Sequence, residues 1–424
     1  MAQHPLIACP HCARLHERLP IQAGAMAACT QCGYVLYRQS GLSLRSWLAV
    51  TYAALIVFAI ANYFPIATLS VQGLVVHASL PYALLLTWQQ GHEIVAVMTG
   101  LFAFGFPLGQ ICFLLWALQS IVSGRLPADF QYGMRVFHAI EPWSMVPVLL
   151  LGVFVAIVKL SGMASLQVGP GLWAIGALSG LLTMLSRVSA YRLWRYAEDA
   201  GLVPRSSADT TGDKVVAACL SCGCVQNLSS VSQDVPCLRC GAHVRFRKAA
   251  PIARGWALVI AAGILYIPAN LLPVMVIRTP AGTTSHTILG GVIELWDLGS
   301  WDLALIVFVA SVVVPMTKLF ALIALMVKRH WRSVGIQRQR TRLYELVEFI
   351  GQWSMLDVFV VILLSAMGNF PGLTQITAGP GAASFGLVVI LTMFAAMSYD
   401  PRIGWDERFA YRRPNHPAAS VKPG

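Results

Sequence analysis

Eight runs of apolar residues constrain this chain more than any other feature of its sequence. A helix that spans a bilayer needs about 20 predominantly apolar residues. Only 11% of the residues are charged, against about 25% in soluble domains. We therefore predict an all-α polytopic membrane protein with one span for each run. The runs cover residues 46–68, 94–122, 142–162, 171–190, 255–277, 302–327, 349–368 and 382–398.

The distribution of lysine and arginine predicts the orientation. Basic residues gather in the N-terminal segment, in the central segment and after the sixth run, whereas the alternate loops 69–93, 163–170, 278–301 and 369–381 carry only Arg278 between them. Basic loops stay on the cytoplasmic side of a membrane. Both termini and the central segment are therefore predicted to be cytoplasmic. The net charge of +12 is explained by these flanking residues and does not call for nucleic acid.

The sequence also repeats itself, with offsets of 208 or 210 residues between motifs that occur in the same order. Each half carries two Cys-x2-Cys pairs followed by four predicted spans. An even number of spans gives both halves the same orientation, so the repeat is parallel rather than inverted. The other matched motifs are Asn62-Tyr-Phe-Pro65 with Asn270-Leu-Leu-Pro273, Pro107 with Pro315, Trp143-Ser-Met145 with Trp353-Ser-Met355, and Gly169-Pro-Gly171 with Gly379-Pro-Gly381.

The cysteine pairs predict two metal sites. Their spacings, Cys-x2-Cys-x16-Cys-x2-Cys and Cys-x2-Cys-x14-Cys-x2-Cys, are typical of structural zinc sites with four thiolate ligands. Disulfides are the alternative, but the predicted cytoplasmic location keeps thiols reduced. Thioredoxin-like redox chemistry is disfavoured because no βαβ pattern surrounds the pairs. The predicted ligands are Cys9, Cys12, Cys29 and Cys32 at the first site, and Cys219, Cys222, Cys237 and Cys240 at the second.

These patterns predict five segments. A zinc ribbon can bind nucleic acid, but each of these is short and tethered to a membrane helix, which favours docking or scaffolding. The predicted segments are 1–42, the first zinc ribbon; 43–198, the first four-helix transmembrane unit; 199–250, the second ribbon; 251–400, the second transmembrane unit; and 401–424, a cytoplasmic tail.

A lysine in the sixth apolar run is the most unusual residue of the membrane part. Lys318 lies about 15 Å from the cytoplasmic end of its helix, near the midplane of the bilayer. An unpaired lysine there costs at least about 2.5 kcal/mol, so a partner or a water-filled cavity is expected. Asp357 in the seventh run lies at a similar depth and is the predicted partner. Polar residues predicted to surround this pair are Ser354, Ser311, Thr317 and Thr392.

Two interpretations of the pair remain open. It is either a buried ion pair that only fastens helices together, or a relay for protons or substrate, since intramembrane charges commonly mark pathways. At the equivalent positions the first half has Gln110 and Pro147, so the pair is specific to the second half. No nucleophile–base set, phosphate loop or haem motif occurs, and we expect no enzyme activity.

Together these motifs resemble the paraquat-inducible protein A family. The resemblance rests on the tandem Cys-rich units, on Pro315-Met-Thr-Lys318 and on Trp353-Ser-Met-Leu-Asp357, and it covers roughly residues 5–400. It implies a protein of the Gram-negative inner membrane that moves phospholipids between that membrane and a periplasmic tunnel of MCE-domain proteins. It also implies transmembrane units similar to tetraspanin-type four-helix folds. A membrane thiol redox protein linked to quinones and a scaffold that transports nothing are the alternative functions.

Overall fold

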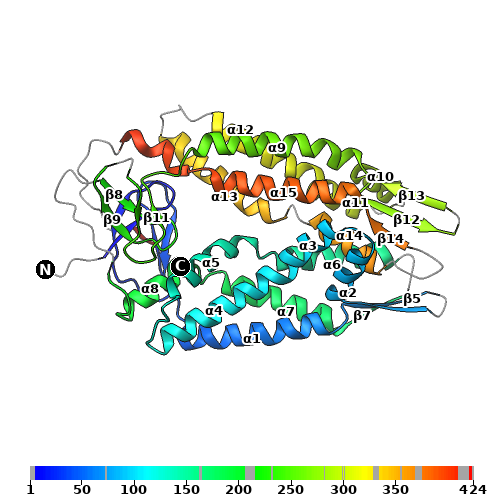
Figure 1. The fold of residues 1–424 in the computed structure, drawn as a ribbon, viewed down its shortest axis with the longest axis horizontal. Helices are drawn as coiled ribbons and strands as arrows, with labels where there is room; N and C mark the ends of the chain where they lie inside the picture. The colour runs from blue at the N-terminus through cyan, green and yellow to red at the C-terminus, as the bar shows by residue number, and fades with distance from the viewer. Residues whose placement is uncertain are drawn as a thin grey trace.

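Both halves of the chain run through nearly the same order of elements: a small Cys-rich ribbon, a long helix, a strand hairpin, and then further helices (Figure 1). The computed structural model describes residues 5–71, 74–161, 165–205, 215–230, 233–280, 282–297, 299, 301–327, 334–353, 356–367, 375–408 and 420–422. The ribbons lie at one end of the elongated helical bundle, called here the ribbon end, and the hairpins lie at the other, the sheet end.

The first half consists of ribbon 1, which is strands β1 to β4, and a helical unit. Its elements are β1 (Leu6–Ala8), β2 (Leu15–Glu17), β3 (Met26–Ala28), β4 (Val35–Arg38), α1 (Leu44–Tyr63), β5 (Ala67–Val71), β6 (Leu74–Ala78), α2 (Leu80–Gln89), α3 (Glu93–Gly100), the π-helical turn η1 (Leu101–Gly105), α4 (Phe106–Val122), α5 (Phe130–Ile140), the 3₁₀ turn η2 (Glu141–Trp143), α6 (Val146–Ser161), β7 (Ser165–Val168), α7 (Pro170–Leu185) and α8 (Ala190–Asp199).

The second half repeats this plan with ribbon 2, which is strands β8 to β11. Its elements are β8 (Val215–Ala218), β9 (Val225–Leu228), β10 (Val235–Pro236), β11 (His243–Val244), α9 (Pro251–Leu271), β12 (Met275–Thr279), β13 (Gly282–His286), α10 (Ile288–Asp297), α11 (Trp301–Phe308), the π-helical turn η3 (Val309–Val313), α12 (Val314–Val327), α13 (Val334–Trp353), α14 (Leu356–Met367), β14 (Gln375–Ala378), α15 (Pro380–Ser398), the 3₁₀ helix η5 (Pro401–Arg408) and β15 (Ser420–Lys422).

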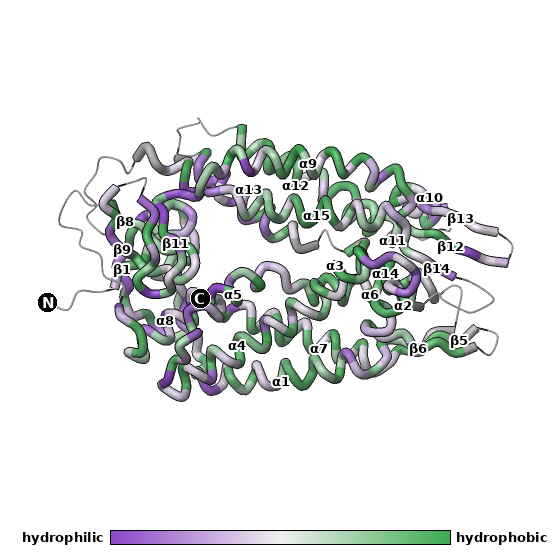
Figure 2. The backbone as a smooth tube through the Cα atoms, in the orientation of Figure 1, coloured by the Kyte–Doolittle hydropathy of each residue, from purple (hydrophilic) through white to green (hydrophobic). Residues whose placement is uncertain are grey.

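Several helices have the length and composition of membrane spans. Within the described residues six helical stretches qualify, or seven if α7 and α8, which meet at a bend of 54°, form one span. Apolar residues run along these helices between the two ends of the bundle (Figure 2). The six are Leu44–Tyr63, Glu93–Val122, Phe130–Ile157, Pro251–Leu271, Ala304–Val327 and Pro380–Trp405.

This finding confirms the multi-pass helical architecture. The predicted span 171–190 falls on α7, which already ends at Leu185. The predicted span 349–368 falls on the end of α13 and on α14, on either side of residues 354–355, which lie outside the described part. The count of eight spans therefore stays a prediction.

Two three-stranded antiparallel sheets at the sheet end were not predicted. Their orders are β6-β5-β7 and β13-β12-β14, and each is built from a hairpin plus a strand that comes directly before the last long helix of its half. The all-α description of the chain is thus incomplete: its core is helical, but segments at and between the ends of the predicted spans pair as strands.

The two repeated motifs with glycine and proline meet each other at these sheets. The amide of Gly171 donates to the Pro65 carbonyl at 3.0 Å, and in the second half Gly381 donates to the Pro273 carbonyl, also at 3.0 Å. A Cβ atom at Gly379 would lie only 2.1 Å from the Pro273 oxygen. Only glycine permits such an approach, so the Gly-Pro-Gly and Asn-x-x-Pro motifs form one joint in each half.

The prolines of the second and sixth predicted spans follow π-helical turns. In η1 the amide of Phe106 donates to the Leu101 carbonyl, and in η3 the amide of Val314 donates to the Val309 carbonyl. A proline ring inside a helix clashes with the carbonyl four residues earlier, and the wider turn relieves this clash before Pro107 and Pro315. Such turns are frequent at functional sites, and here they occur in both halves.

Helix α14 joins the two halves through a shared core. Phe359 on α14 is fully buried, and a Cβ atom at Gly152 on α6 would lie 3.2 Å from it. Ser365 donates to the side-chain oxygen of Gln90 at 3.1 Å, and Trp143 packs against Phe394 of α15. Buried residues of the first unit, of α14 and of part of α15 therefore form one apolar core, and α9, α12, α13 and other residues of α15 form a second core.

Candidate metal centres and intramembrane polar site

The eight predicted cysteine ligands form two clusters of four. The four sulfur atoms of each cluster lie within 4.8 Å of one another. The closest pairs are Cys9–Cys32 and Cys12–Cys29 at 3.5 Å, and in the second cluster Cys219–Cys240 at 3.6 Å and Cys222–Cys237 at 3.5 Å. All eight thiols are free. Four thiolates at about 2.3 Å from one zinc ion lie about 3.8 Å apart in a tetrahedron, so both clusters fit a tetrahedral metal.

The same backbone turn presents the cysteines in all four pairs. The amide four residues after the first cysteine donates to its carbonyl, with distances of 2.8, 3.0, 2.9 and 2.9 Å for Ala13, Gly33, Gly223 and Gly241. Each of these four residues has a positive φ, and Ala13, with φ of 61°, is the one residue among them that is not glycine. The Cys-x2-Cys spacing thus dictates one turn used four times.

Neighbouring groups support the sulfurs. His16 is fully buried, and its Nε2 lies 3.3 Å from the Cys29 sulfur. Hydrogen bonds from Cys12, then from Cys32, hold the pKa of the Cys29 thiol below its usual range. The amides of Ser221 and Arg239 point at the sulfurs of Cys219 and Cys237, each at 3.4 Å. Each cluster could hold a metal ion with its four cysteine sulfurs, and His16 was not predicted from the sequence.

Ribbon 1 contacts the second half of the chain. His11 Nδ1 lies 3.2 Å from Glu345 Oε1 on α13, and because burial lowers the pKa of His11 to about 4, the ring in this contact is neutral near pH 7. Arg338 on α13 donates to the Gln31 carbonyl at 2.9 Å. Trp405 of η5 is only 2% exposed and packs into the apolar core of ribbon 1, and β15 pairs with β3.

Ribbon 2 contacts the first half of the chain. Tyr191 on α8 donates to the Leu220 carbonyl. The buried ion pair between Arg239 and Glu198 joins ribbon 2 to the same helix, with Nη2 and Oε2 2.8 Å apart. Ribbon 1 reaches α8 as well, through Arg18 and Asp199 at 2.7 Å. Each ribbon therefore contacts elements of the other half of the chain, which the sequence repeat does not reveal.

Lys318 is buried inside the second helical unit. It lies nine residues before Val327, the last residue of α12, which is about 14 Å along the helix axis. Its side chain is 2% exposed, and Nζ has no hydrogen-bond partner among the residues that the structure describes. A Cβ atom at Gly351 on α13 would lie 3.1 Å from Nζ. The ammonium group therefore lies against the end of α13, a few residues before the Trp-Ser-Met-Leu-Asp motif.

The predicted partners of Lys318 are only partly described. Ser354 and the side chain of Asp357 lie outside the described part, and α14 begins at Leu356. Ser311 and Thr392 are buried, and their hydroxyls donate to carbonyls of their own helices, Ser311 to Val307 at 2.6 Å and Thr392 to Val389 at 2.9 Å.

Thr317 is exposed on α12, next to the buried Lys318. Thr317 therefore does not share the buried environment of Lys318. The Lys318–Asp357 contact stays a prediction, because the Asp357 side chain lies outside the described part.

The equivalent site in the first half is polar without a lysine. Gln110 is 4% exposed, and its side-chain oxygen has no partner among the described residues. At the offset of 210 residues, Gly351 corresponds to Glu141. Both halves place a buried polar side chain three residues after the proline that follows the π-helical turn, and only the second half places a lysine there.

Comparisons with known proteins agree with the architecture. The sequence model of the paraquat-inducible protein A family matches residues 44–198 and 252–408. The chain is 31% identical over 410 residues to the intermembrane transport protein PqiA of Escherichia coli K12, covering 95% of this chain and 96% of that protein. It is 30% identical over 401 residues to the lipophilic envelope-spanning tunnel protein A of the same organism, covering 94% and 90%. No solved structure was found to match. The chain thus belongs to the paraquat-inducible protein A family.

Proposed function

We propose that this protein is the inner-membrane subunit of an intermembrane lipid transport system. The observation that carries the proposal is the similarity, over 95% of the chain, to a protein named for intermembrane transport. The six apolar helices are consistent with a membrane location. In this proposal phospholipids pass between the inner membrane and a periplasmic tunnel made of MCE-domain proteins.

The proposal includes an orientation. Basic residues favour the cytoplasmic side, which places the ribbon end in the cytoplasm and the two sheets in the periplasm. The sheets would then face the MCE partner, because they stand at the end of the bundle opposite the ribbons.

Zinc is the metal that we assign to both ribbons. Each cluster has two sulfur pairs 3.5–3.6 Å apart, and its four sulfurs lie within 4.8 Å of one another. These distances suit the tetrahedral thiolate coordination of zinc, and a closed shell of four protein ligands leaves no position for a substrate. Its role here is structural. The cysteines hold the ribbons together, and the ribbons join the two helical units at the ribbon end.

Within the membrane we assign the energy-coupling role to Lys318 and Asp357. Lys318 is buried against the end of α13, and Asp357 is the second residue of α14. α14 also packs against the first half. A change in the protonation of this pair would therefore act on the helix that joins both units.

Complementation in cells tests the transport role. We expect that cells lacking this protein become sensitive to detergent and that the wild-type gene restores resistance. Asp357→Asn, expressed at the same level, should fail to restore it. The matched control is Asp302→Asn, which changes an exposed carboxylate at the start of α11 and should restore resistance.

A biochemical arm separates transport from scaffolding. The purified protein should carry phospholipid and should be captured by a periplasmic MCE-domain protein. Complementation by Asp357→Asn, or a purified protein that binds neither phospholipid nor an MCE domain, would contradict the proposal.

A further inference from the structure

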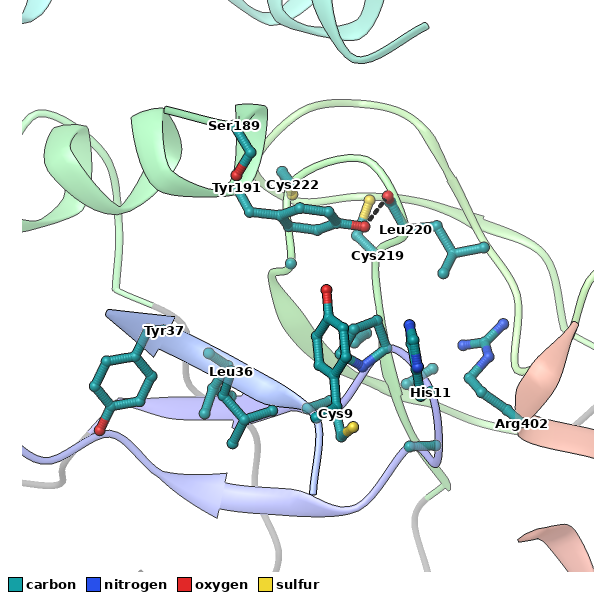
Figure 3. A pocket seen from close by; sticks show the side chains of 18 of the residues that line it. Cys9, His11, Leu36, Tyr37, Ser189, Tyr191, Cys219, Leu220, Cys222 and Arg402 are labelled. Atoms are coloured by element: carbon teal, nitrogen blue, oxygen red, sulfur yellow. Dashed lines mark hydrogen bonds between the residues drawn. The ribbon is translucent and has the colours of Figure 1, made fainter. Parts of the chain in front are cut away.

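A large cavity separates the two ribbons at the ribbon end of the molecule (Figure 3). Its volume is about 1760 Å³, whereas pockets for small ligands measure about 300–1,000 Å³. Ribbon 1 and ribbon 2 form opposite walls, Tyr191 of α8 lies between them, and Arg402 of η5 faces the space from the second half. Three of the cluster cysteines, Cys9, Cys219 and Cys222, also border the cavity, which is distinct from the intramembrane site.

Positive charge dominates the wall of this cavity. Ten cationic side chains line it, against three carboxylates, Glu198, Glu348 and Asp400. Two of these carboxylates already have a partner: Glu198 pairs with Arg239 and Asp400 pairs with Arg402, each at 2.8 Å. The ten cations are Arg14, Arg18, Arg38, Arg187, Arg192, Arg195, Arg239, Arg247, Lys248 and Arg402.

The metal clusters do not account for this surplus. A zinc ion with four thiolates carries about two negative charges, so two such sites offset about four cations. The three lining carboxylates offset three more, and Asp199, just outside, offsets Arg18. Ten cations therefore still exceed the negative groups around them.

Several of these cations are held in place by neutral groups. Arg192 donates to the Tyr196 hydroxyl at 2.8 Å and lies over the rings of Trp47 and Tyr196. Arg195 donates to the Tyr191 carbonyl at 3.3 Å and lies over the Tyr37 ring. These contacts position a guanidinium group without neutralising it, which prepares the wall for an anion at little cost in side-chain entropy.

We propose that the cavity is a binding site for a phosphate-bearing anion. A guanidinium group can donate two parallel hydrogen bonds to the oxygens of one phosphate. The cavity is large enough for more than one phosphate. The ligand is either a soluble phosphate compound of the cytoplasm or the headgroup of an anionic phospholipid. Because both ribbons line the cavity, its occupant bridges them. This proposal does not depend on the proposed transport function.

Binding measurements on the purified, zinc-loaded full-length protein test this site. Inorganic triphosphate probes the soluble source, and a short-chain phosphatidylglycerol below its micelle concentration probes the headgroup source. We expect one of them to raise the unfolding temperature saturably at low salt. The test variant is Arg14→Gln/Arg187→Gln, because neither side chain contacts a carboxylate among the described residues. It should weaken binding by about tenfold or more, since each charged hydrogen bond contributes at least about a factor of ten.

A second variant and a control sharpen the test. Arg187→Gln alone lies far in sequence from all eight cysteines, so it carries the test if the double variant loses zinc. The control Arg125→Gln/Arg254→Gln removes the same charge from exposed arginines outside the cavity and should bind like the wild type. Binding of triphosphate alone identifies a soluble ligand, and binding of the lipid alone identifies a headgroup. The proposal is overturned if neither probe binds, if the cavity variants bind normally, or if the control weakens binding equally.

Discussion

Replacing Lys318 by methionine distinguishes a relay from an ion pair that only fastens helices together. Methionine keeps the length and apolar stem of lysine but removes the charge. Lys318 is 2% exposed, and its Nζ has no hydrogen-bond partner among the described residues. Burying such a charge in the membrane costs at least about 2.5 kcal/mol, and Lys318→Met removes this cost.

The two roles of the pair predict opposite changes in stability. If Lys318 and Asp357 form a permanent ion pair, the substitution leaves Asp357 buried without a partner and destabilises the protein by about 3–5 kcal/mol. If they form a relay, Asp357 takes up a proton once Lys318 is gone, and stability stays equal or rises by about 2 kcal/mol. The two outcomes differ by several kcal/mol, which corresponds to an unfolding-temperature difference of several degrees.

We expect the relay result: Lys318→Met unfolds at or above the wild-type temperature in detergent and fails to restore detergent resistance in cells. The matched control is Gln110→Met, which changes the equivalent buried position of the first half and should preserve function. A large drop in the unfolding temperature of Lys318→Met, reversed in the double variant Lys318→Met/Asp357→Asn, would identify a structural ion pair. Full complementation by Lys318→Met would refute any role in transport.

Other predictions concern the joints and metal sites. Gly379→Ala should lower the unfolding temperature markedly, because its Cβ would lie 2.1 Å from the Pro273 oxygen and overpacking costs about 1–3 kcal/mol. The control Gly176→Ala, with no neighbour within 4 Å, should be neutral or stabilising. Equal unfolding temperatures of the two variants would contradict the described joint. Trp405→Ala should destabilise ribbon 1 by about 3–5 kcal/mol, seen as faster zinc loss to a chelator, whereas unchanged zinc retention would show that η5 does not support the ribbon. Metal analysis should find about two zinc ions per chain, and Cys29→Ser should lower this to about one; an unchanged zinc content would contradict the four-thiolate assignment.

The sequence predicted features that depend on local chemistry. Cysteine spacing alone predicted which cysteines gather in each cluster of four, because a Cys-x2-Cys turn fixes its own geometry. The offset repeat identified Gln110 and Lys318 as equivalent, and both are buried. The Gly-Pro-Gly motifs, which the repeat singled out, mark the starts of α7 and α15, since proline pre-sets the first helical φ.

The features that were missed depend on long-range contacts or on weak local signals. The hairpin of β5 and β6 joins two short runs rich in β-branched residues around Gln72-Gly73, a pattern that weakly indicates a turn. The third strand of each sheet comes from more than 80 residues further along the chain, so no local pattern announces it. Nothing in the cysteine spacing says which half a ribbon contacts, and the burial of Trp405 is likewise decided only by tertiary packing.

The pairing of β15 with β3 and the insertion of Trp405 have a consequence for biogenesis. Residues 26–28 are translated early, but the strand and the aromatic side chain that cover ribbon 1 are translated only after both membrane units. While the rest of the chain is synthesised, ribbon 1 therefore has an unpaired strand edge and an unfilled apolar core, although all four of its cysteines are already present. A chain truncated before residue 405 would lack both β15 and Trp405, so its ribbon 1 would keep an unpaired strand edge and a gap in its apolar core. Ribbon 1 can therefore reach its complete fold only after both membrane units have been synthesised.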